Sequence, residues 1–502
     1  MFLDEANYIY WGKLIASTGQ HWFIPLSGQK NISFIWSMAP WIKILPENAY
    51  LIAGRIPSVL AGAATLLGIY KLSRLLFSST RLGIISALLY VVTPYTLLHD
   101  RMALYDSFLT ATCIWSFYFA LKTSGTLAIR DSLFWGTFLG LAFLTKATAI
   151  LFWFLTPLCF FLLLPKDRAF RNKARIGLLL VIALATGQLL NHSIIVSSGY
   201  KYYMEKSLDY TPTIGELLQN PTKLLGNNLS LTVYWFASYL TTPIFAASIL
   251  GSVLLFFRSA AKALLLVLPV VISVLVFSLL GRIYFPRYIL FTAPFLAIAA
   301  AYALEALFGR LNAVKLSIVT MAVSILALKF DYHLLTSPTS LSSYSRFGWQ
   351  YIDGYSSLAG LSNQIFRSTL TPSLPAIDDW QYISGNPSGY GLETIYQYLD
   401  DRIKNEKITL VIFSEYYGQP LYSTRLRYWD NKNLQILRRW PPSGFDEEIY
   451  SQRKETPVYF LMGDDYRSSR TEIFSSLPLE NLLQGRKPGG RDTIYLTRLK
   501  IF

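Results

Sequence analysis

Cysteine and histidine are scarce in this chain, which has 2 Cys and 4 His among 502 residues. Cys113 and Cys159 both fall inside long apolar runs, which argues against a disulfide framework and against a thiolate metal site. The four histidines are scattered and lack the short spacing that metal ligands on one element show. The sequence therefore gives no sign of a metal centre built on sulfur or imidazole.

Charged residues are also few. They make up 15% of the chain, whereas hydrophobic residues make up 53%. Soluble domains carry about 25% charged residues, so this composition is typical of a polytopic membrane protein. The formal net charge of +15 does not indicate a nucleic-acid partner, because many of the basic residues stand in short loops between apolar runs.

The first 50 residues have no secretory signal peptide. Asp4 and Glu5 stand where a signal peptide has basic residues, and no apolar core follows them. Residues 7–17 and 33–45 mix aromatic, aliphatic and polar side chains at near-helical spacing, as helices in a membrane interface do. We expect residues 1–50 to form the first extracytoplasmic loop, with interfacial helices.

Long apolar runs follow. About 20 apolar residues cross a hydrocarbon core of about 30 Å, so residues 51–332 are predicted to form a transmembrane bundle of about ten helices. Their approximate ranges are 51–77, 82–99, 105–121, 131–148, 150–164, 175–196, 232–257, 262–281, 287–308 and 313–332. The fourth and fifth abut at 146–150, so they form either two short spans or a broken, re-entrant pair.

Basic residues concentrate in alternate loops, which the positive-inside rule places in the cytoplasm. They are Lys71, Arg74, Arg81, Lys122, Arg130, Lys166, Arg168, Arg171, Lys173, Arg175, Arg258, Lys262, Arg310 and Lys315. Residues 1–50 and 333–502 are then extracytoplasmic, on the outer face of a plasma or inner membrane. Nothing upstream of Asp4 would export it, so we expect the coding sequence to begin earlier and to encode one more span.

After residue 332 the composition becomes polar, and helix and strand signals alternate. Residues 392–403 have helical periodicity, and strands are indicated at 408–413, 434–437, 458–461 and 493–496. The predicted fold class is a polytopic α-helical membrane protein with a C-terminal extracytoplasmic α/β domain over 333–502.

One polar stretch, His99 to Asp106, separates two uncharged runs. It is either an ordinary charged turn between two spans or part of a site, because ionisable groups beside a membrane are costly unless they are paired or functional. The functional interpretation gains weight from other charged residues that the predicted topology places on the same face. Lys30, Arg101 and Arg287 lie in outer loops, where topology does not require basic residues.

Four motifs occur in a fixed order on the predicted outer face. They are Asp4-Glu5 with Tyr8 and Lys30; Gly54-Arg55-Ile56-Pro57-Ser58; Arg101 five residues before Asp106; and Arg287-Tyr288 followed by Pro294. Together they resemble the GT-C membrane glycosyltransferases that use polyprenyl-phosphate sugars, in particular protein O-mannosyltransferases and lipid A aminoarabinose transferases. The resemblance extends loosely to Ser388–Glu393. It departs at Asn31-Ile32, where the family has prolines, and in lacking the family's first span.

The resemblance implies a bundle of the GT-C type and an inverting hexosyl- or pentosyltransferase of a bacterial cell envelope. The donor would be a polyprenyl-phosphate sugar, and the acceptor an extracytoplasmic lipid, glycan or protein. It implies Asp4 as general base with Glu5 beside it, and donor or phosphate contacts from Tyr8, Lys30, Arg101, Asp106, Arg287 and Tyr288. This fits the chemistry, because transfer needs a proton acceptor and cations that hold the leaving phosphate.

Three questions stay open at this point. A divalent cation such as Mg²⁺ or Mn²⁺ between carboxylate and phosphate would suit the oxygen ligands available. A transporter or flippase would also have about ten spans, but it should show related halves, which the sequence does not display. A catalytically inactive relative that acts as a scaffold would fit the departures from the family pattern.

Overall fold

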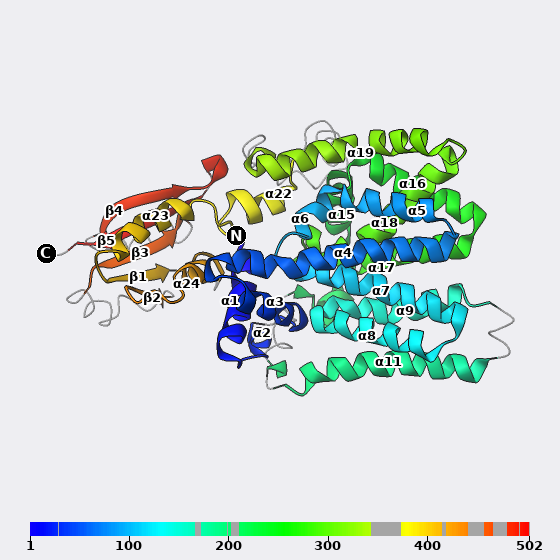
Figure 1. Cartoon of the computed structure of the whole chain (residues 1–502), viewed down its shortest axis with the longest axis horizontal. Helices are drawn as coiled ribbons and strands as arrows, with labels where there is room; N and C mark the ends of the chain where they lie inside the picture. The colour runs from blue at the N-terminus through cyan, green and yellow to red at the C-terminus, as the bar shows by residue number, and fades with distance from the viewer. Residues whose placement is uncertain are drawn as a thin grey trace.

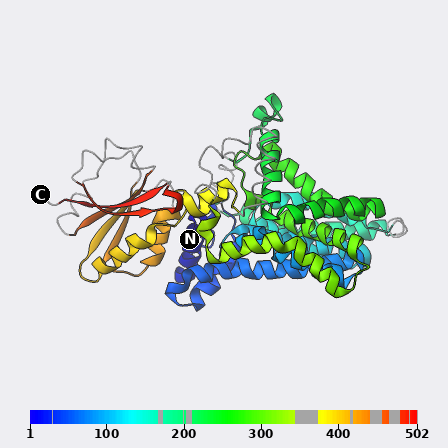
Figure 2. The ribbon, with the colours of Figure 1, turned by 90° about the horizontal axis from the view of Figure 1, so that it is seen from above.

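The computed structural model describes residues 1–28, 30–165, 172–197, 199–201, 210–342, 373–413, 418–439, 456–464, 479–490 and 492–500. Figure 1 shows a bundle of helices with roughly parallel axes and, at one end of it, a domain built on a β-sheet. The N-terminal helices lie between these two parts, and the view from above shows the same arrangement (Figure 2). The predicted helical bundle with a C-terminal α/β domain is therefore confirmed, without its sidedness.

The N-terminal segment forms the helices that the sequence predicts at 7–17 and 33–45. They are α1 (Leu3–Thr18), α2 (Ile24–Ser27) and α3 (Ser33–Ile44), followed by the short turn η1 (Glu47–Ala49). Gly12 allows α1 and α3 to approach closely, since a Cβ there would lie 2.9 Å from Ile42 Cδ1. The face of α1 that carries Gly12 therefore packs against Met38 and Ile42 of α3.

Every predicted apolar run is helical. The elements are α4 (Tyr50–Phe77), α5 (Thr80–Val91), α6 (Pro94–His99), α7 (Tyr105–Thr126), α8 (Ile129–Thr145), η2 (Ala147–Ala149), α9 (Ile150–Leu162), α11 (Lys173–Ile195), α14 (Ile214–Gln219), α15 (Leu225–Tyr239), α16 (Thr242–Arg258), α17 (Ala260–Leu280), η3 (Pro286–Thr292), α18 (Ala293–Phe308), α19 (Ala313–Thr336) and η4 (Pro338–Leu341). Lys166, Arg168 and Arg171, predicted to be cytoplasmic, lie outside the described residues.

Among the described residues, five helices are long and apolar enough to cross a membrane. They cover Glu47–Phe77, Lys173–Ile195, Ala260–Leu280, Pro286–Phe308 and Ala313–Thr336. A sixth is added if α15 and α16 count as one span, but the chain bends by 112° between them. The predicted span 232–257 is therefore divided into two helices: Thr241 has φ 64° between them, and Pro243 follows in the first turn of α16.

Two further breaks interrupt the helices in this region. The predicted span 82–99 is divided into α5 and α6, because Pro94 starts a new helix after Thr93 in an extended conformation. At the junction of the fourth and fifth predicted spans, Lys146 has φ −157° and ψ 140°, which ends α8 before η2 and α9.

The C-terminal part opens with α22 (Ala376–Asp379) and the π-helical turn η7 (Trp380–Ser384). Its other elements are α23 (Leu392–Ile403), β1 (Ile408–Phe413), η8 (Gly418–Tyr422), α24 (Ser423–Arg427), β2 (Leu434–Arg439), β3 (Val458–Gly463), β4 (Leu479–Arg486), η9 (Pro488–Gly490) and β5 (Thr493–Leu499). The sheet has the order β2-β1-β3-β5-β4, with β1 parallel to β2 and β3 and with β5 antiparallel to β3 and β4.

The predicted helix 392–403 and all four predicted strands are confirmed. The sequence missed β4, whose only pairing among the described strands is with β5 and contains an irregularity at Asn481 and Leu483. An edge strand with polar residues has little local strand signal, and its pairing with β5 decides its conformation.

The first helix joins the two parts. Tyr10 stacks on Tyr422 with ring centroids 3.9 Å apart, and it meets Trp429 edge-on. Ala6 belongs to the same buried apolar cluster as Leu392 and Leu421 of the C-terminal part. Helix α1 is thus packed both against α3 and against the sheet domain.

Candidate active site

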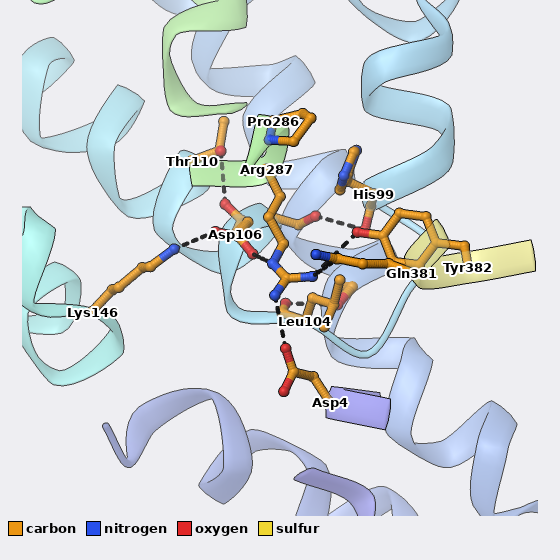
Figure 3. A network of polar contacts seen from close by, with 12 residues as sticks. Asp4, His99, Leu104, Asp106, Thr110, Lys146, Pro286, Arg287, Gln381 and Tyr382 are labelled. Atoms are coloured by element: carbon orange, nitrogen blue, oxygen red, sulfur yellow. Dashed lines mark hydrogen bonds and ion pairs between the residues drawn. The ribbon is translucent and has the colours of Figure 1, made fainter. Parts of the chain in front are cut away.

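Arg287 is the centre of a buried polar network at the junction of the two parts (Figure 3). It lies on η3, and its side chain is 7% exposed. Nη2 donates to Asp4 Oδ2 at 2.8 Å, and Nη1 donates to Gln381 Oε1 at 2.8 Å and to the Tyr382 hydroxyl at 3.3 Å. Nε lies 3.9 Å from Asp106 Oδ2. The network joins the first helix, the bundle and the C-terminal part.

Asp106 lies between two cations. It is in the first turn of α7, where the helix dipole favours a carboxylate. Its Oδ1 accepts from Lys146 Nζ at 2.7 Å, and its Oδ2 faces Arg287. The extended backbone at Lys146 sets the direction of that side chain, whose ammonium also lies 3.9 Å from the centre of the Tyr288 ring. The two cations are therefore held in fixed positions by one shared carboxylate.

A cavity of about 430 Å³ adjoins this network. Its polar lining comes from Tyr8, Lys30, Tyr105, Asp106, Lys146, Arg287 and Tyr288, and its apolar lining includes Ile150, Leu151, Val276, Phe277, Leu280 and Ile283. Lys30 also faces the Tyr210 ring at 5.9 Å. Three cations beside an apolar wall give the cavity the chemistry to bind an anionic head group that carries an apolar chain.

Glu5 lies apart from the cavity and is fully buried. Arg55 holds it through two bonds, from Nε at 2.8 Å and from Nη2 at 2.9 Å. The backbone N–H groups of Ala103 and Phe2 donate to the same carboxylate at 2.9 Å and 3.0 Å. Burial opposes its ionisation, but Arg55 and these hydrogen bonds hold the pKa of Glu5 below its usual value. The structure therefore gives Glu5 the contacts of an anchor rather than of a second reacting group.

Arg101 also lies outside the cavity lining. Its Nη2 donates to the carbonyl of Leu334 at 3.1 Å, and its charge interacts with Asp331 and Arg55. Arg101 is therefore not part of the network around Arg287, whereas Lys146 pairs with Asp106 and lines the cavity. Of the predicted residues, the structure brings together Asp4, Tyr8, Lys30, Asp106, Arg287 and Tyr288.

Gln381 and Tyr382 were missed by the sequence analysis. They lie on η7 in a polar region, where neither residue type stands out and where only the fold brings them to Arg287. Asp378, one turn earlier, accepts from the Tyr239 hydroxyl, and burial raises the pKa of Asp378 to about 7. The C-terminal part therefore supplies two of the hydrogen-bond acceptors of Arg287, from Gln381 and Tyr382.

The carboxylates of this network are already paired with side-chain cations. Asp106 lines the cavity, Asp4 does not, and Arg287 forms an ion pair with each of them. Within the described ranges, no cluster of three or more His, Cys, Asp or Glu could hold a metal ion. The positive charge at this point comes from the side chains of the chain itself.

Residues 32–189 match the family model for dolichyl-phosphate-mannose-protein mannosyltransferase. The whole structure is similar to the crystal structure of ArnT from Cupriavidus metallidurans in the apo state, with a TM-score of 0.57 and 13% identity, over 98% of this chain and 93% of that chain. The chain therefore has the same overall fold as ArnT over nearly all of its length. The ArnT structure bound to undecaprenyl phosphate matches over the same shares of the two chains, with a TM-score of 0.53 and 13% identity. Comparison with curated proteins gives no match.

The anchor role of Glu5 can be measured. We expect Glu5→Gln to lower the free energy of unfolding by about 3–5 kcal/mol, because it leaves the half-buried Arg55 without its carboxylate. Glu47→Gln is the matched control, since Glu47 is 70% exposed and pairs with Lys13 at 3.4 Å; its effect should stay below about 1 kcal/mol. Denaturant unfolding of the purified protein in detergent gives both values, and equal midpoints for the two variants would contradict the anchor role.

Proposed function

We propose that this chain transfers a sugar from a polyprenyl-phosphate-linked donor to a hydroxyl acceptor, with inversion at the sugar carbon. The observation that carries this proposal is the cavity, in which Lys30, Lys146 and Arg287 line one space together with an apolar wall. Its chemistry matches a phosphate on an isoprenoid chain. The family model names a dolichyl-phosphate-mannose enzyme, and one of the similar structures holds undecaprenyl phosphate.

In this proposal the donor phosphate lies among the three cations. The planar guanidinium of Arg287 can donate two parallel hydrogen bonds to two phosphate oxygens, and the ammonium groups of the two lysines act as point charges. Asp106 holds Lys146 and Arg287 in place, which lowers the cost of ordering them when the donor binds. The hydroxyls of Tyr8 and Tyr288 also line the cavity and can donate to phosphate oxygens. The lipid chain would lie along the apolar side chains of α9 and α17.

Asp4 is the proposed general base. Its carboxylate is 15% exposed and is turned toward the cation cluster by Arg287, which binds Oδ2. The acceptor hydroxyl oxygen forms a bond to the sugar carbon while the bond from that carbon to the phosphate oxygen breaks. The electron pair stays on the phosphate, which the cations stabilise, and the hydroxyl proton passes to Asp4. A direct displacement of this kind inverts the configuration at carbon.

The test is transfer by the purified full chain. It is incubated with a radiolabelled polyprenyl-phosphate sugar and with membrane extracts that contain lipid, glycan and protein acceptors. Label in an acceptor, with an anomeric configuration opposite to that of the donor by NMR, supports the proposal. A retained configuration would overturn the inverting step. Absence of transfer, with the donor nevertheless bound, would favour the scaffold, and movement of the intact donor across a vesicle membrane would favour the flippase.

We also propose that the cavity, the first loop and the C-terminal domain face the extracytoplasmic side, because the basic loops favour the opposite side. Lys223→Cys and Lys404→Cys, at exposed positions, should react with an impermeant maleimide in intact cells. Lys315→Cys, also exposed, should react only after lysis. The native Cys113 and Cys159 are buried and give a low background. The reverse labelling pattern would overturn this orientation.

A further inference from the structure

We propose that Lys487 is a positioning residue for Asp4, through which the C-terminal domain sets the geometry of the active site without supplying a reacting group. The proposal rests on the proposed function, because it concerns the placement of the general base. Four contacts connect Lys487 to Asp4 and Arg287, and each lies at the junction between the sheet domain and the first helix.

The first contact is the ammonium of Lys487 itself. Lys487 follows β4, and its side chain is only 3% exposed. Nζ donates to the carbonyl oxygens of Gly385 at 2.7 Å, Asn386 at 2.9 Å and Ser388 at 3.0 Å. Three acceptors match the three N–H donors of an ammonium. A charge in a buried place costs several kcal/mol unless its bonds are made, so this lysine fixes the path of residues 385–388.

The second and third contacts join that loop to the start of α1. Phe2 forms an isolated antiparallel bridge with Ser388, and the N–H of Leu3 donates to the carbonyl of Pro387 at 3.0 Å. Leu3 is the first residue of α1, so its N–H has no acceptor within the helix. The loop therefore fixes where α1 begins, one residue before Asp4.

The fourth contact runs through Phe2 to Arg287. The Phe2 ring meets Tyr382 edge-on with centroids 4.9 Å apart, and the guanidinium carbon of Arg287 lies 5.2 Å from the same ring. The loop that Lys487 holds thus supports Asp4 through the start of α1, whereas Arg287 is also held by Asp106 of the bundle. A shift of about 1 Å at a reacting group can cost about 10²-fold in rate, so the position of Asp4 depends on this support.

Lys487→Met tests the positioning role of Lys487, because methionine keeps the length of the side chain and removes the three hydrogen bonds of the ammonium. We expect kcat to fall by about 10- to 100-fold. The dissociation constant for the polyprenyl-phosphate donor should change by less than about threefold, since the cavity lining comes from the bundle and the first loop. Lys404→Met, which alters an exposed lysine of the same domain, should leave both values unchanged. Lys487→Arg, which keeps a buried cation with several donors, should recover part of the lost kcat.

Leu3→Pro tests the same positioning role at the start of α1. It removes the N–H that donates to Pro387, while proline is tolerated at the first position of a helix. Phe2, with φ −95° and ψ 160°, already has the backbone that a following proline requires. We expect the same loss of kcat with donor binding kept. The losses of Leu3→Pro and Lys487→Met should not multiply in the double variant, because both break one chain of contacts.

The outcomes separate the two proposals. No transfer by the wild-type chain overturns the proposed function. Wild-type transfer together with a normal kcat in Lys487→Met overturns the positioning role, as does a loss of kcat that is matched by an equal loss of donor affinity. If Lys487→Met does not fold, Leu3→Pro decides: a normal kcat in that variant overturns the role, and a lower kcat at unchanged donor affinity supports it.

Discussion

Asp4→Asn is expected to lower turnover by a factor on the order of 10²–10⁴, the usual effect of removing a general base. Asparagine keeps the shape of the side chain and an oxygen that can accept from Arg287, but it cannot take the proton of the acceptor hydroxyl. The affinity for the polyprenyl-phosphate donor should stay within about threefold of wild type, because other residues line the cavity. The interaction that Asp4→Asn removes is made mainly in the transition state.

Steady-state transfer and equilibrium binding of the donor measure the two quantities separately. Asp401→Asn is a matched control, because Asp401 is 77% exposed and pairs only with Lys404 among the described residues. Asp106→Asn is the informative contrast. It loosens Lys146 and Arg287, so it should weaken donor binding as well as turnover. Wild-type turnover in Asp4→Asn would remove Asp4 as the base and make Asp106 the next candidate.

Arg287→Met is expected to lower turnover by about 10³-fold and donor affinity by about 10²-fold. Methionine fills most of the space but removes the fork that faces the phosphate, and it leaves the carboxylates of Asp4 and Asp106 near each other without the cation between them. Removing one partner of a buried charge pair costs about 2–5 kcal/mol in binding, and removing one donor to a developing charge costs about 10²–10³ in rate.

Arg287→Lys separates charge from geometry. It keeps the cation but offers no planar fork, so it should restore donor affinity more than turnover. Arg130→Met is the control for an arginine-to-methionine change, since Arg130 is 77% exposed. Equal donor affinity in Arg287→Met and the wild type would refute the phosphate role of Arg287. Arg101→Met should leave donor affinity near the wild-type value, because Arg101 lies outside the cavity lining.

The hydrophobic periodicity of the sequence determined most of the helices and strands. Residues 392–403 and 408–413 have the periodicities of an amphipathic helix and of a buried strand, and the structure has α23 and β1 with those bounds. The apolar runs are helical because backbone hydrogen bonds within each run satisfy its own polar groups. Among the candidate residues, counting the predicted spans places Asp4, Lys30, Asp106 and Arg287 on the same side of the membrane, which predicts that they group together.

The tertiary structure alone decided which of these groups meet. Asp4 and Glu5 are adjacent in the sequence, but successive side chains on an α-helix point about 100° apart, at 3.6 residues per turn. Asp4 therefore faces Arg287, whereas Glu5 faces Arg55. Arg101 and Asp106 are separated by the turn that precedes α7, so only Asp106 reaches the cavity.

Long-range packing also decided the role of the C-terminal domain. Gln381 lies 94 positions from Arg287, and Lys487 lies 102 positions from Gly385. No periodicity in a single sequence encodes such pairs, because they depend on how a polar domain is docked against the end of the bundle. The sequence by itself determined a membrane-embedded chain with charged residues in the loops between its apolar runs; the packing of α1 between the bundle and the sheet determined which of those charges form the site.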